Sequence, residues 1–323
     1  MRAAPALRTA ALALLALAAN ARAAETVKPP LPVREAQTPN AVIFDPHPDK
    51  AHPPGMADVR IPSHGANMNA VLYTASGGAP HPVVLLFHGF PGNEQNLDLA
   101  QAIRRAGFTV LTLHYRGSWG SPGKFSFANA LEDSDAALAW LKDPATVSKF
   151  HLDPRRIFLA GHSMGGMMAA SATAHDPRVA GLVMISAWDI GAQGPSFADP
   201  EFRKKQLENG FADNVIPLAT TPEALMDEIV ANASKWDFVD YTPDLKSRPV
   251  LILTADDGLT EDNVRLATSL KHAGDTDVTE QHMATDHSYS DRRIALESVV
   301  VRWLERHQSA ALPAVPQATA KTP

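Results

Sequence analysis

The stretch IFLAGHSMGG, residues 157–166, joins a strand-like apolar run to a helix-like segment through a turn that contains Ser163. Gly161 and Gly165 stand two residues on either side of this serine, in the pattern G-x-S-x-G. The pattern is typical of a nucleophile elbow, in which a serine in a strained conformation projects its hydroxyl above a sheet. The alternative is a glycine-rich turn with an incidental serine. Because a strand precedes the turn and a helix follows it, we predict that Ser163 is a nucleophile.

Strand-like and helix-like segments alternate around this stretch, which predicts a mostly parallel central sheet with helices on both faces. A hairpin over 58–61 and 69–74 comes first. The other expected strands, which bring the sheet to about eight, are 83–87, 109–113, 156–160, 182–186, 250–254 and 278–282. The expected helices are 94–106, 128–141, 164–174, 262–273 and 290–307. The run VVLLF over 83–87 is apolar throughout, as expected of a strand buried on both faces.

Residues 189–247 interrupt the alternation, because no strong strand occurs between two expected strands. The interval is too long for an ordinary connection. It carries six aromatic residues, at Phe197, Phe202, Phe211, Trp236, Phe238 and Tyr241. We therefore expect a small helical cap inserted over the active site.

Both ends of the chain differ in composition from its centre. Residues 1–23 combine an arginine-containing start, a short apolar run and the small-x-small pattern Ala21-Arg22-Ala23, which predicts a signal peptide cleaved near Ala23. The apolar run is too short to be a stable membrane anchor. Residues 24–54 are expected to be an extended lead-in, 55–308 the catalytic domain and 309–323 a disordered tail. These features predict an exported protein, either periplasmic or secreted.

Composition excludes several classes of function. The 323 residues contain no Cys, so disulfides, Cys-ligated metal and a thiol nucleophile are ruled out. A formal net charge of -6 without a basic run argues against nucleic-acid binding. No HExxH, phosphate-loop or dinucleotide motif is present, so we expect neither a metal nor a cofactor. Oligomeric state has no marker in the sequence.

A serine hydrolase needs donors for the negative oxygen of its tetrahedral intermediate. One donor would be the backbone N–H of Met164, directly after the nucleophile. The second should come from the loop HGFPG, residues 88–92, directly after the strand VVLLF. We predict the N–H of Phe90, because Pro91 has none. His88 is interpreted as a structural residue that supports the loop.

The general base must be a histidine that follows the last strand, where a loop at the carboxyl end of the sheet can reach Ser163. His287 lies in such a loop and is preferred over His282, which ends the strand. The acid that orients it should follow the strand VLILT. Asp257 is favoured there, and Asp256 and Asp189 remain the alternatives.

These motifs resemble the α/β-hydrolase superfamily over roughly residues 58–307. Within it, the chain looks most like bacterial esterases and peptidases related to dienelactone hydrolase and the prolyl oligopeptidase catalytic domain, through the segments HYRGSWG (114–120) and LEDSDAALAWL (131–141). The resemblance implies an acid three residues after Thr254, which is Asp257. HGFPG also resembles the loop of epoxide hydrolases and haloalkane dehalogenases, but those enzymes carry an Asp where this chain has Ser163.

The favoured hypothesis is a carboxylic ester hydrolase that forms an acyl-enzyme on Ser163 and acts on a small-molecule ester. Trp119 and Trp188 are expected to contact the substrate. The alternative is a serine peptidase of the aminopeptidase or dipeptidyl-peptidase type, acting on a short peptide. Such an enzyme needs carboxylates for the substrate ammonium, and the candidates are Glu132 with Asp133, or the cap acids Glu201 and Glu208. A third hypothesis is a binding protein that keeps the fold without catalysis.

Overall fold

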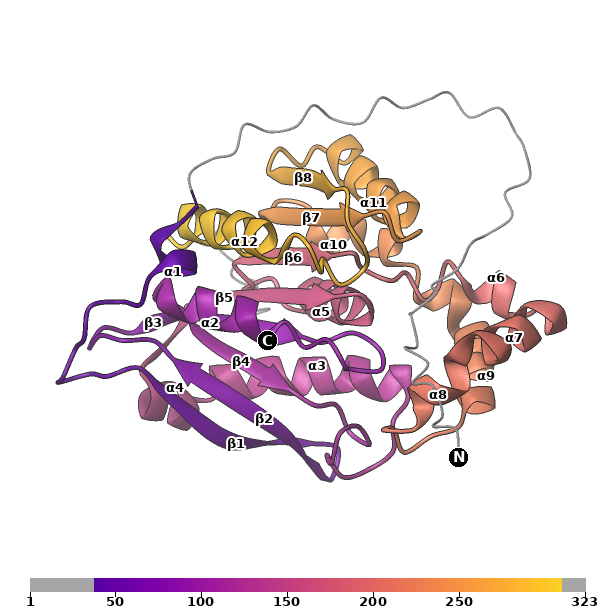
Figure 1. The fold of residues 1–323 in the computed structure, drawn as a ribbon, viewed down its shortest axis with the longest axis horizontal. Coiled ribbons are helices and arrows are strands. Elements are labelled where there is room, and N and C mark those ends of the chain that lie inside the picture. The colour runs from indigo at the N-terminus through magenta and orange to yellow at the C-terminus, as the bar shows by residue number, and fades with distance from the viewer. Residues whose placement is uncertain (1–37, 310–323) are drawn as a thin grey trace, which may run out of the picture.

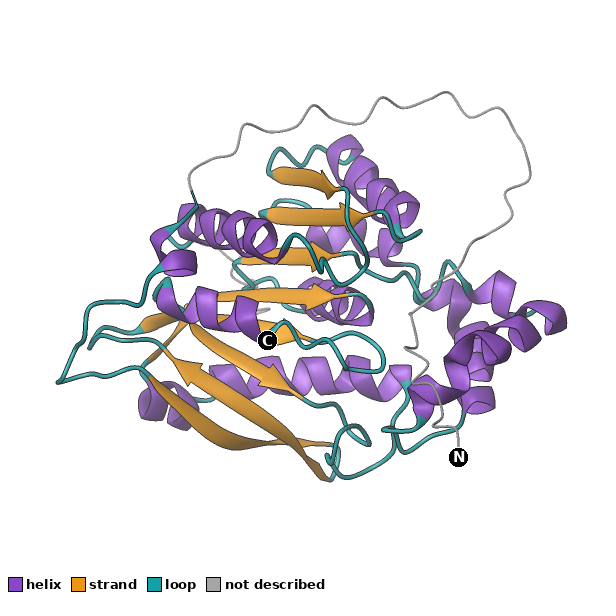
Figure 2. Cartoon of the chain, viewed as in Figure 1, coloured by secondary structure: helices purple, strands orange, loops and turns teal. Residues whose placement is uncertain are grey.

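A computed structural model of the chain describes residues 38–309. The predicted signal peptide, part of the lead-in and nearly all of the predicted tail lie outside this range. The centre is one eight-stranded sheet with the order β1-β2-β4-β3-β5-β6-β7-β8 (Figures 1 and 2). Its strands are β1 Gly55–Ser63, β2 Ala66–Thr74, β3 His81–Phe87, β4 Thr109–Leu113, β5 Leu152–His162, β6 Gly181–Ile185, β7 Val250–Ala255 and β8 Val278–Met283.

The sheet is parallel from β4 to β8, and only β1 and β2 run antiparallel to their neighbours. This confirms the expected hairpin and the mostly parallel sheet. Strand β3 shows why its sequence is apolar throughout. Val83, Leu85 and Phe87 belong to the core on one face of the sheet, and Val84 and Leu86 belong to the core on the other.

Helices cover both faces. Helices α2 (Leu97–Arg105) and α12 (Arg293–His307) contribute side chains to one core, and α3 (Phe127–Lys142), α5 (Met164–His175) and α11 (Thr260–His272) contribute to the other. Helix α2 begins three residues later than predicted, because Asn96 has a left-handed backbone (φ 55°) that cannot belong to a helix.

Two short helices were not predicted from the sequence. Helix α4 (Pro144–Phe150) begins after Asp143, whose carboxylate accepts hydrogen bonds from the N–H groups of Ala145 and Thr146. An Asp followed by Pro is a signal for a helix start that could have identified it. Helix α1 (Asn40–Ile43) lies in the segment expected to be extended, and it packs against α2 and α12.

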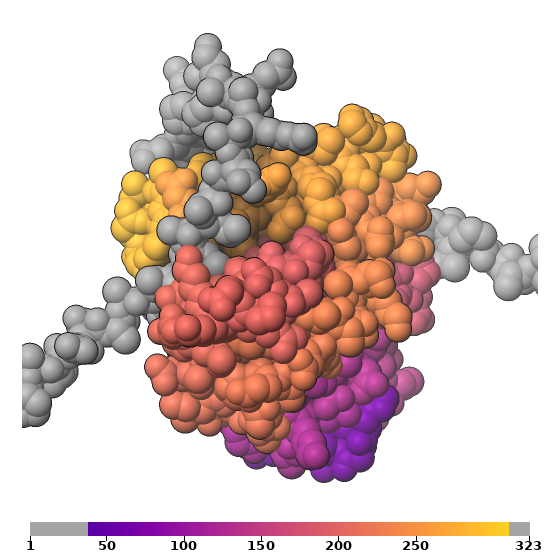
Figure 3. Space-filling model, turned by 90° about the vertical axis from the view of Figure 1, so that its right-hand side faces the viewer, coloured from indigo at the N-terminus to yellow at the C-terminus, as the bar shows by residue number. Residues whose placement is uncertain are grey.

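The interval 189–247 is helical, as expected. It contains α6 (Gly194–Phe197), α7 (Pro200–Gln206), η1 (Leu207–Phe211), α8 (Ala212–Val215), α9 (Pro222–Asn232), η2 (Ala233–Lys235), η3 (Phe238–Tyr241) and α10 (Thr242–Leu245). Elements α6 to α9 lie beyond the carboxyl ends of the parallel strands, and we call them the cap (Figure 1). Figure 3 faces this end of the molecule, where cap residues cover much of the visible surface. Helix α10 instead packs against α5 and α11.

No helix within residues 38–309 has the length and apolar character needed to cross a membrane.

Candidate active site

Ser163 lies between β5 and α5, at the carboxyl edge of the sheet. Its backbone has φ 57° and ψ -124°, a conformation that costs a non-glycine residue energy and persists only where neighbours enforce it. Its N–H donates to the carbonyl of Ile185 at 2.9 Å, and its own carbonyl accepts from the N–H of Trp188 at 2.9 Å. These bonds to the end of β6 and the loop after it hold the strained turn.

The elbow glycines are required by close backbone approach. A Cβ on Gly161 would lie 1.9 Å from the carbonyl oxygen of Gly165, and a Cβ on Gly165 would lie 2.3 Å from that of Phe87. No L side chain fits at either position. The helix start therefore packs directly on the ends of β3 and β5, which places the N–H of Met164 at the first turn of α5.

His287 and Asp257 meet at the same edge of the sheet. The Nδ1 of His287 donates to the Oδ2 of Asp257 at 2.8 Å, so Nε2 is left as the basic nitrogen. The Asp257 side chain is 1% exposed. Burial alone would raise the pKa of this carboxyl, but hydrogen bonds from His287, Ser186 and the N–H of Leu259 outweigh it and lower the pKa. Asp257 thus remains ionised beside the histidine.

The alternative residues are occupied elsewhere. The imidazole of His282 bonds to Thr254 at 3.0 Å and to Asp256 at 3.0 Å, and the Asp256 side chain is mostly exposed. Asp189 is fully buried and pairs with Arg265 at 3.0 Å. Of the three candidate acids, Asp257 is therefore the one that contacts His287.

The loop HGFPG crosses the elbow. A Cβ on Gly89 would lie 2.8 Å from the Cβ of Ser163, so the loop backbone passes close to this serine. Phe90, whose N–H is the predicted second donor, directly follows this point of close approach, and its role stays a prediction. His88 is buried, and its Nδ1 bonds to the carbonyl of Gly89 at 2.7 Å. Burial lowers the pKa of His88 to about 4, so it supports the loop as a neutral imidazole.

Trp119 braces this loop from outside. Its Nε1 donates to the carbonyl of Pro91 at 2.7 Å, and its ring lies near that of His114. The side chain is partly exposed. This contact suits a loop-supporting residue, and its expected contact with substrate remains a prediction.

An aromatic cluster lies between the loop HGFPG and the cap. The ring of Phe90 lies 5.4 Å from that of Phe211, 5.9 Å from Phe127 and 6.3 Å from Trp188, as centroid distances. Phe211 belongs to η1, so the cap contributes directly. The Nε1 of Trp188 is buried and has no hydrogen-bond partner within residues 38–309. An unpaired buried donor costs about 1–3 kcal/mol, so this N–H marks a place where an acceptor would be stabilised.

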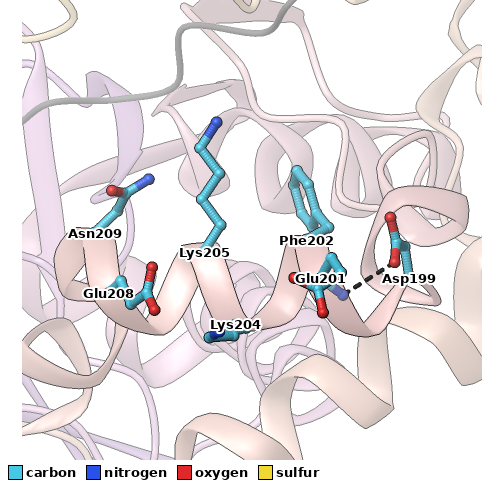
Figure 4. Close-up of a pocket in the computed structure, with 7 residues that line it drawn as sticks. All are labelled: Asp199, Glu201, Phe202, Lys204, Lys205, Glu208 and Asn209. Carbon is cyan, nitrogen blue, oxygen red and sulfur yellow. Dashed lines mark hydrogen bonds between the residues drawn. The ribbon is translucent and has the colours of Figure 1, made fainter.

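The carboxylates considered for an ammonium clamp are already engaged or exposed. Asp133 is buried and bonds to Ser63 and Arg116, and Glu132 also bonds to Arg116. Glu201 and Glu208 line an open hollow on the outer surface of α7 and η1, beside Lys204 and Lys205 (Figure 4). In that hollow the charges are mixed. Neither pair offers a free acidic site next to Ser163.

Several residues that shape the site were not predicted from the sequence. Ser186 has a left-handed backbone (φ 42°), and its hydroxyl lies 3.0 Å from that of Tyr289 as well as bonding to Asp257. His162, inside the elbow, bonds through Nε2 to the carbonyl of His287 at 2.8 Å. A serine directly after the β6 strand carries no local motif. The only sequence signal for His162 is its place next to Ser163 in the G-x-S-x-G pattern.

Comparisons with known proteins agree with this architecture. A family model described as the alpha/beta hydrolase fold matches residues 82–227. The structure of a hyperthermophilic esterase from Pyrobaculum calidifontis superposes with a TM-score of 0.60 at 20% identity, over 81% of this chain and 88% of that one. The chain therefore has the α/β-hydrolase fold. The narrower likeness to the dienelactone hydrolase and prolyl oligopeptidase group stays a prediction.

Two curated relatives add sequence similarity. The carboxylic ester hydrolase LipN of Mycobacterium tuberculosis is 30% identical over 36% of this chain and 31% of its own length. The quorum-quenching protein AidA of Acinetobacter baumannii is 24% identical over 73% of this chain and 88% of its own length. The curated relatives that reach 30% identity are matched over less than half of their length.

Proposed function

We propose that the protein is a carboxylic ester hydrolase that uses Ser163 as nucleophile, His287 as general base and Asp257 as the acid that orients it. The observation that supports this most is the Asp257–His287 pair at 2.8 Å, at the edge of the sheet where the strained Ser163 lies. LipN is similar to this chain over part of its sequence, and the Pyrobaculum esterase is similar to it in fold. The names of both proteins favour ester substrates.

The chemistry follows from which nitrogen of His287 is free. Since Nδ1 donates to Asp257, Nε2 accepts the proton of Ser163 as its oxygen attacks the ester carbonyl. The N–H groups of Met164 and Phe90 stabilise the resulting oxyanion. His287 then protonates the leaving alcohol, and water attacks the acyl-enzyme with the same residues acting again.

The substrate we propose is a small-molecule ester whose acyl group enters the aromatic cluster around Phe90, Phe127 and Trp188. Those rings offer an apolar surface, and the buried Nε1 of Trp188 offers one polar anchor. We also propose export, which is supported by the sequence pattern of residues 1–23. Sequencing of the mature N-terminus after cell fractionation tests the export proposal.

The decisive experiment compares wild type with Ser163→Ala on p-nitrophenyl butanoate and on an aminoacyl-naphthylamide. We expect ester turnover by wild type, loss of turnover in the variant, and labelling of wild type alone by a fluorophosphonate probe. Wild-type ester turnover that persists in Ser163→Ala would refute the mechanism. Turnover of the amide with negligible ester hydrolysis would favour the peptidase.

A further inference from the structure

His162 lies between Gly161 and Ser163, and its side chain points towards the face of the sheet that α2 and α12 cover. Along β5, Phe158 and Ala160 belong to the core beneath α2 and α12, and side chains alternate along a strand. His162 therefore faces the side of the sheet on which the loop between β8 and α12 lies. That loop contains His287.

The contact between the two histidines is specific. The Nε2 of His162 lies 2.8 Å from the carbonyl oxygen of His287, and the two rings have centroids 4.6 Å apart. A carbonyl only accepts, so the proton of His162 must be on Nε2. His162 is buried, and its Nδ1 has no partner within residues 38–309.

We propose that His162 is a positioning residue, which holds the backbone of His287 through its Nε2–H donor while Asp257 holds the ring. This inference rests on the proposed function of His287. Two hydrogen bonds from the ends of β5 and β7 then restrain His287. His162 holds its main chain, and Asp257 holds its Nδ1. Arg293 adds a third hold on the same loop, since it donates to the carbonyl of Ser288 at 2.9 Å.

A neutral donor suits this position. Burial, together with the neighbouring His287, lowers the pKa of His162 to about 3, so the ring carries no charge at neutral pH. A permanently charged donor at the same place would oppose the positive charge that His287 acquires when it takes the serine proton. A neutral imidazole supplies the hydrogen bond without that opposition.

The test compares three variants of the full protein with wild type: His162→Leu, His162→Gln and His307→Leu. Leu removes the donor, and Gln can present an amide N–H near the position of Nε2. His307 is the matched control, because it is also buried and bonds through Nδ1 to a backbone carbonyl, that of Trp303, at 2.8 Å in α12. Both Leu variants should lose stability.

For His162→Leu we expect kcat to fall about 10–100-fold with KM within about 3-fold, since small misplacements of a catalytic group have such effects. His162→Gln should recover kcat to within about 3-fold of wild type, and His307→Leu should keep the wild-type kcat. Amide hydrogen exchange over 284–292 should be faster in His162→Leu alone. Equal losses for Leu and Gln, or unchanged exchange and kcat in His162→Leu, would overturn the proposal.

Two further measurements keep the test decisive. Ser163→Ala is assayed in the same series, and full activity in that variant would show that the ester mechanism itself is wrong. Hydrogen exchange reports on the His162–His287 contact in either case. If His162→Leu does not fold, NMR of ¹⁵N-histidine-labelled wild type decides. We expect a neutral His162 with its proton on Nε2 at pH 7, and a proton on Nδ1 would refute the positioning role.

Discussion

The loops at the carboxyl edge of the sheet and the cap that lies over them are built in different ways. Around Ser163, backbone hydrogen bonds to neighbouring strands and glycines without room for a Cβ determine the geometry. The cap consists of short helices whose apolar side chains, such as Phe211, Leu225 and Ile229, join one core of the sheet, and a few polar contacts fix its position. One attachment is Glu228 of α9, whose carboxylate accepts from the N–H groups of Phe127 and Ala128 at the start of α3.

Two other attachments hold the cap, one on its flanks and one at its middle. Arg265 of α11 binds Asp189, which precedes α6, and Asp237, which follows α9. In between, Ala219 exchanges backbone hydrogen bonds with Gly117 and Phe125. The groups proposed to react therefore lie on backbone held by the sheet, whereas the position of the cap, which we propose to face the substrate, depends on side-chain contacts that single substitutions can remove.

The largest expected effect concerns the loops at the carboxyl edge of the sheet. Asp257→Asn should lower kcat about 10³–10⁴-fold, because the amide can stabilise the wrong tautomer of His287 and cannot balance its charge. Steady-state kinetics on p-nitrophenyl butanoate measures this. Asp256→Asn is the matched control, since its exposed carboxylate bonds to His282 instead, and it should remain within about 2-fold of wild type. If both variants behaved alike, Asp257 would not be the acid.

The carboxyl edge of the sheet and the cap also differ in how well their structures can be predicted from the sequence. Ser163, His287 and Asp257 could be proposed because each follows a strand in a recognisable local pattern, and parallel strands end at one edge. Strands β4, β6, β7 and β8 lie within about one residue of their predicted bounds, whereas β1, β2 and β5 begin earlier than predicted. What no local pattern encodes is a tertiary contact, such as the pairing of Arg265 with acids 76 and 28 residues away.

The cap shows this limit most clearly. Its length and aromatic content predicted helices over the site, but its internal boundaries depend on contacts with α3 and α11 that a sequence does not display. Helix α10 illustrates the point, because the insertion was expected to lie over the site and this part packs against α5 on the face of the sheet.

The second prediction compares a glycine from each region by its effect on stability. Gly165→Ala should destabilise the fold by about 4 kcal/mol or more, because its Cβ would overlap the backbone oxygen of Phe87. Gly210 in the cap has a left-handed backbone (φ 95°), but a Cβ there would meet only the Asp213 carboxylate, at an ordinary contact distance of 3.9 Å. Gly210→Ala should therefore cost roughly 1–2 kcal/mol, the penalty of that conformation alone. Urea denaturation gives both values, and similar losses would contradict the contrast.

The third prediction concerns the clamp formed by Arg265. Arg265→Ala leaves the buried Asp189 facing Asp237, and should cost about 2 kcal/mol, below the range for fully buried pairs because Arg265 is partly exposed. Burial and the nearby Asp237 raise the pKa of Asp189 to about 8. Since the unfolded chain ionises at lower pH than the folded one, stability falls as pH rises towards that value, and the loss in the variant should be larger at pH 9 than at pH 6.

Limited proteolysis distinguishes loosening of the cap from general destabilisation in Arg265→Ala. We expect faster cleavage within 189–247, while the rest of the chain remains resistant. Lys271→Ala is the control on the same helix, because its exposed pair with Glu280 should contribute little. Uniform cleavage along the chain would show that Arg265 does not act on the cap in particular.

The smallest expected effect tests the surface that the cap covers. Trp188→Phe keeps an aromatic ring beside Phe90 and Phe127 but removes the buried Nε1–H. p-Nitrophenyl methoxyacetate and p-nitrophenyl butanoate differ by an ether oxygen in place of one CH₂, so they report whether that N–H binds an acceptor in the acyl chain. We expect kcat/KM for the methoxyacetate to fall about 3–10-fold relative to butanoate, the worth of one neutral hydrogen bond. Trp119→Phe, which loses a bond to Pro91 in the loop HGFPG, should affect both esters equally. If Trp188→Phe also affected both equally, the indole would be a packing residue, and the cap would select acyl groups by shape alone.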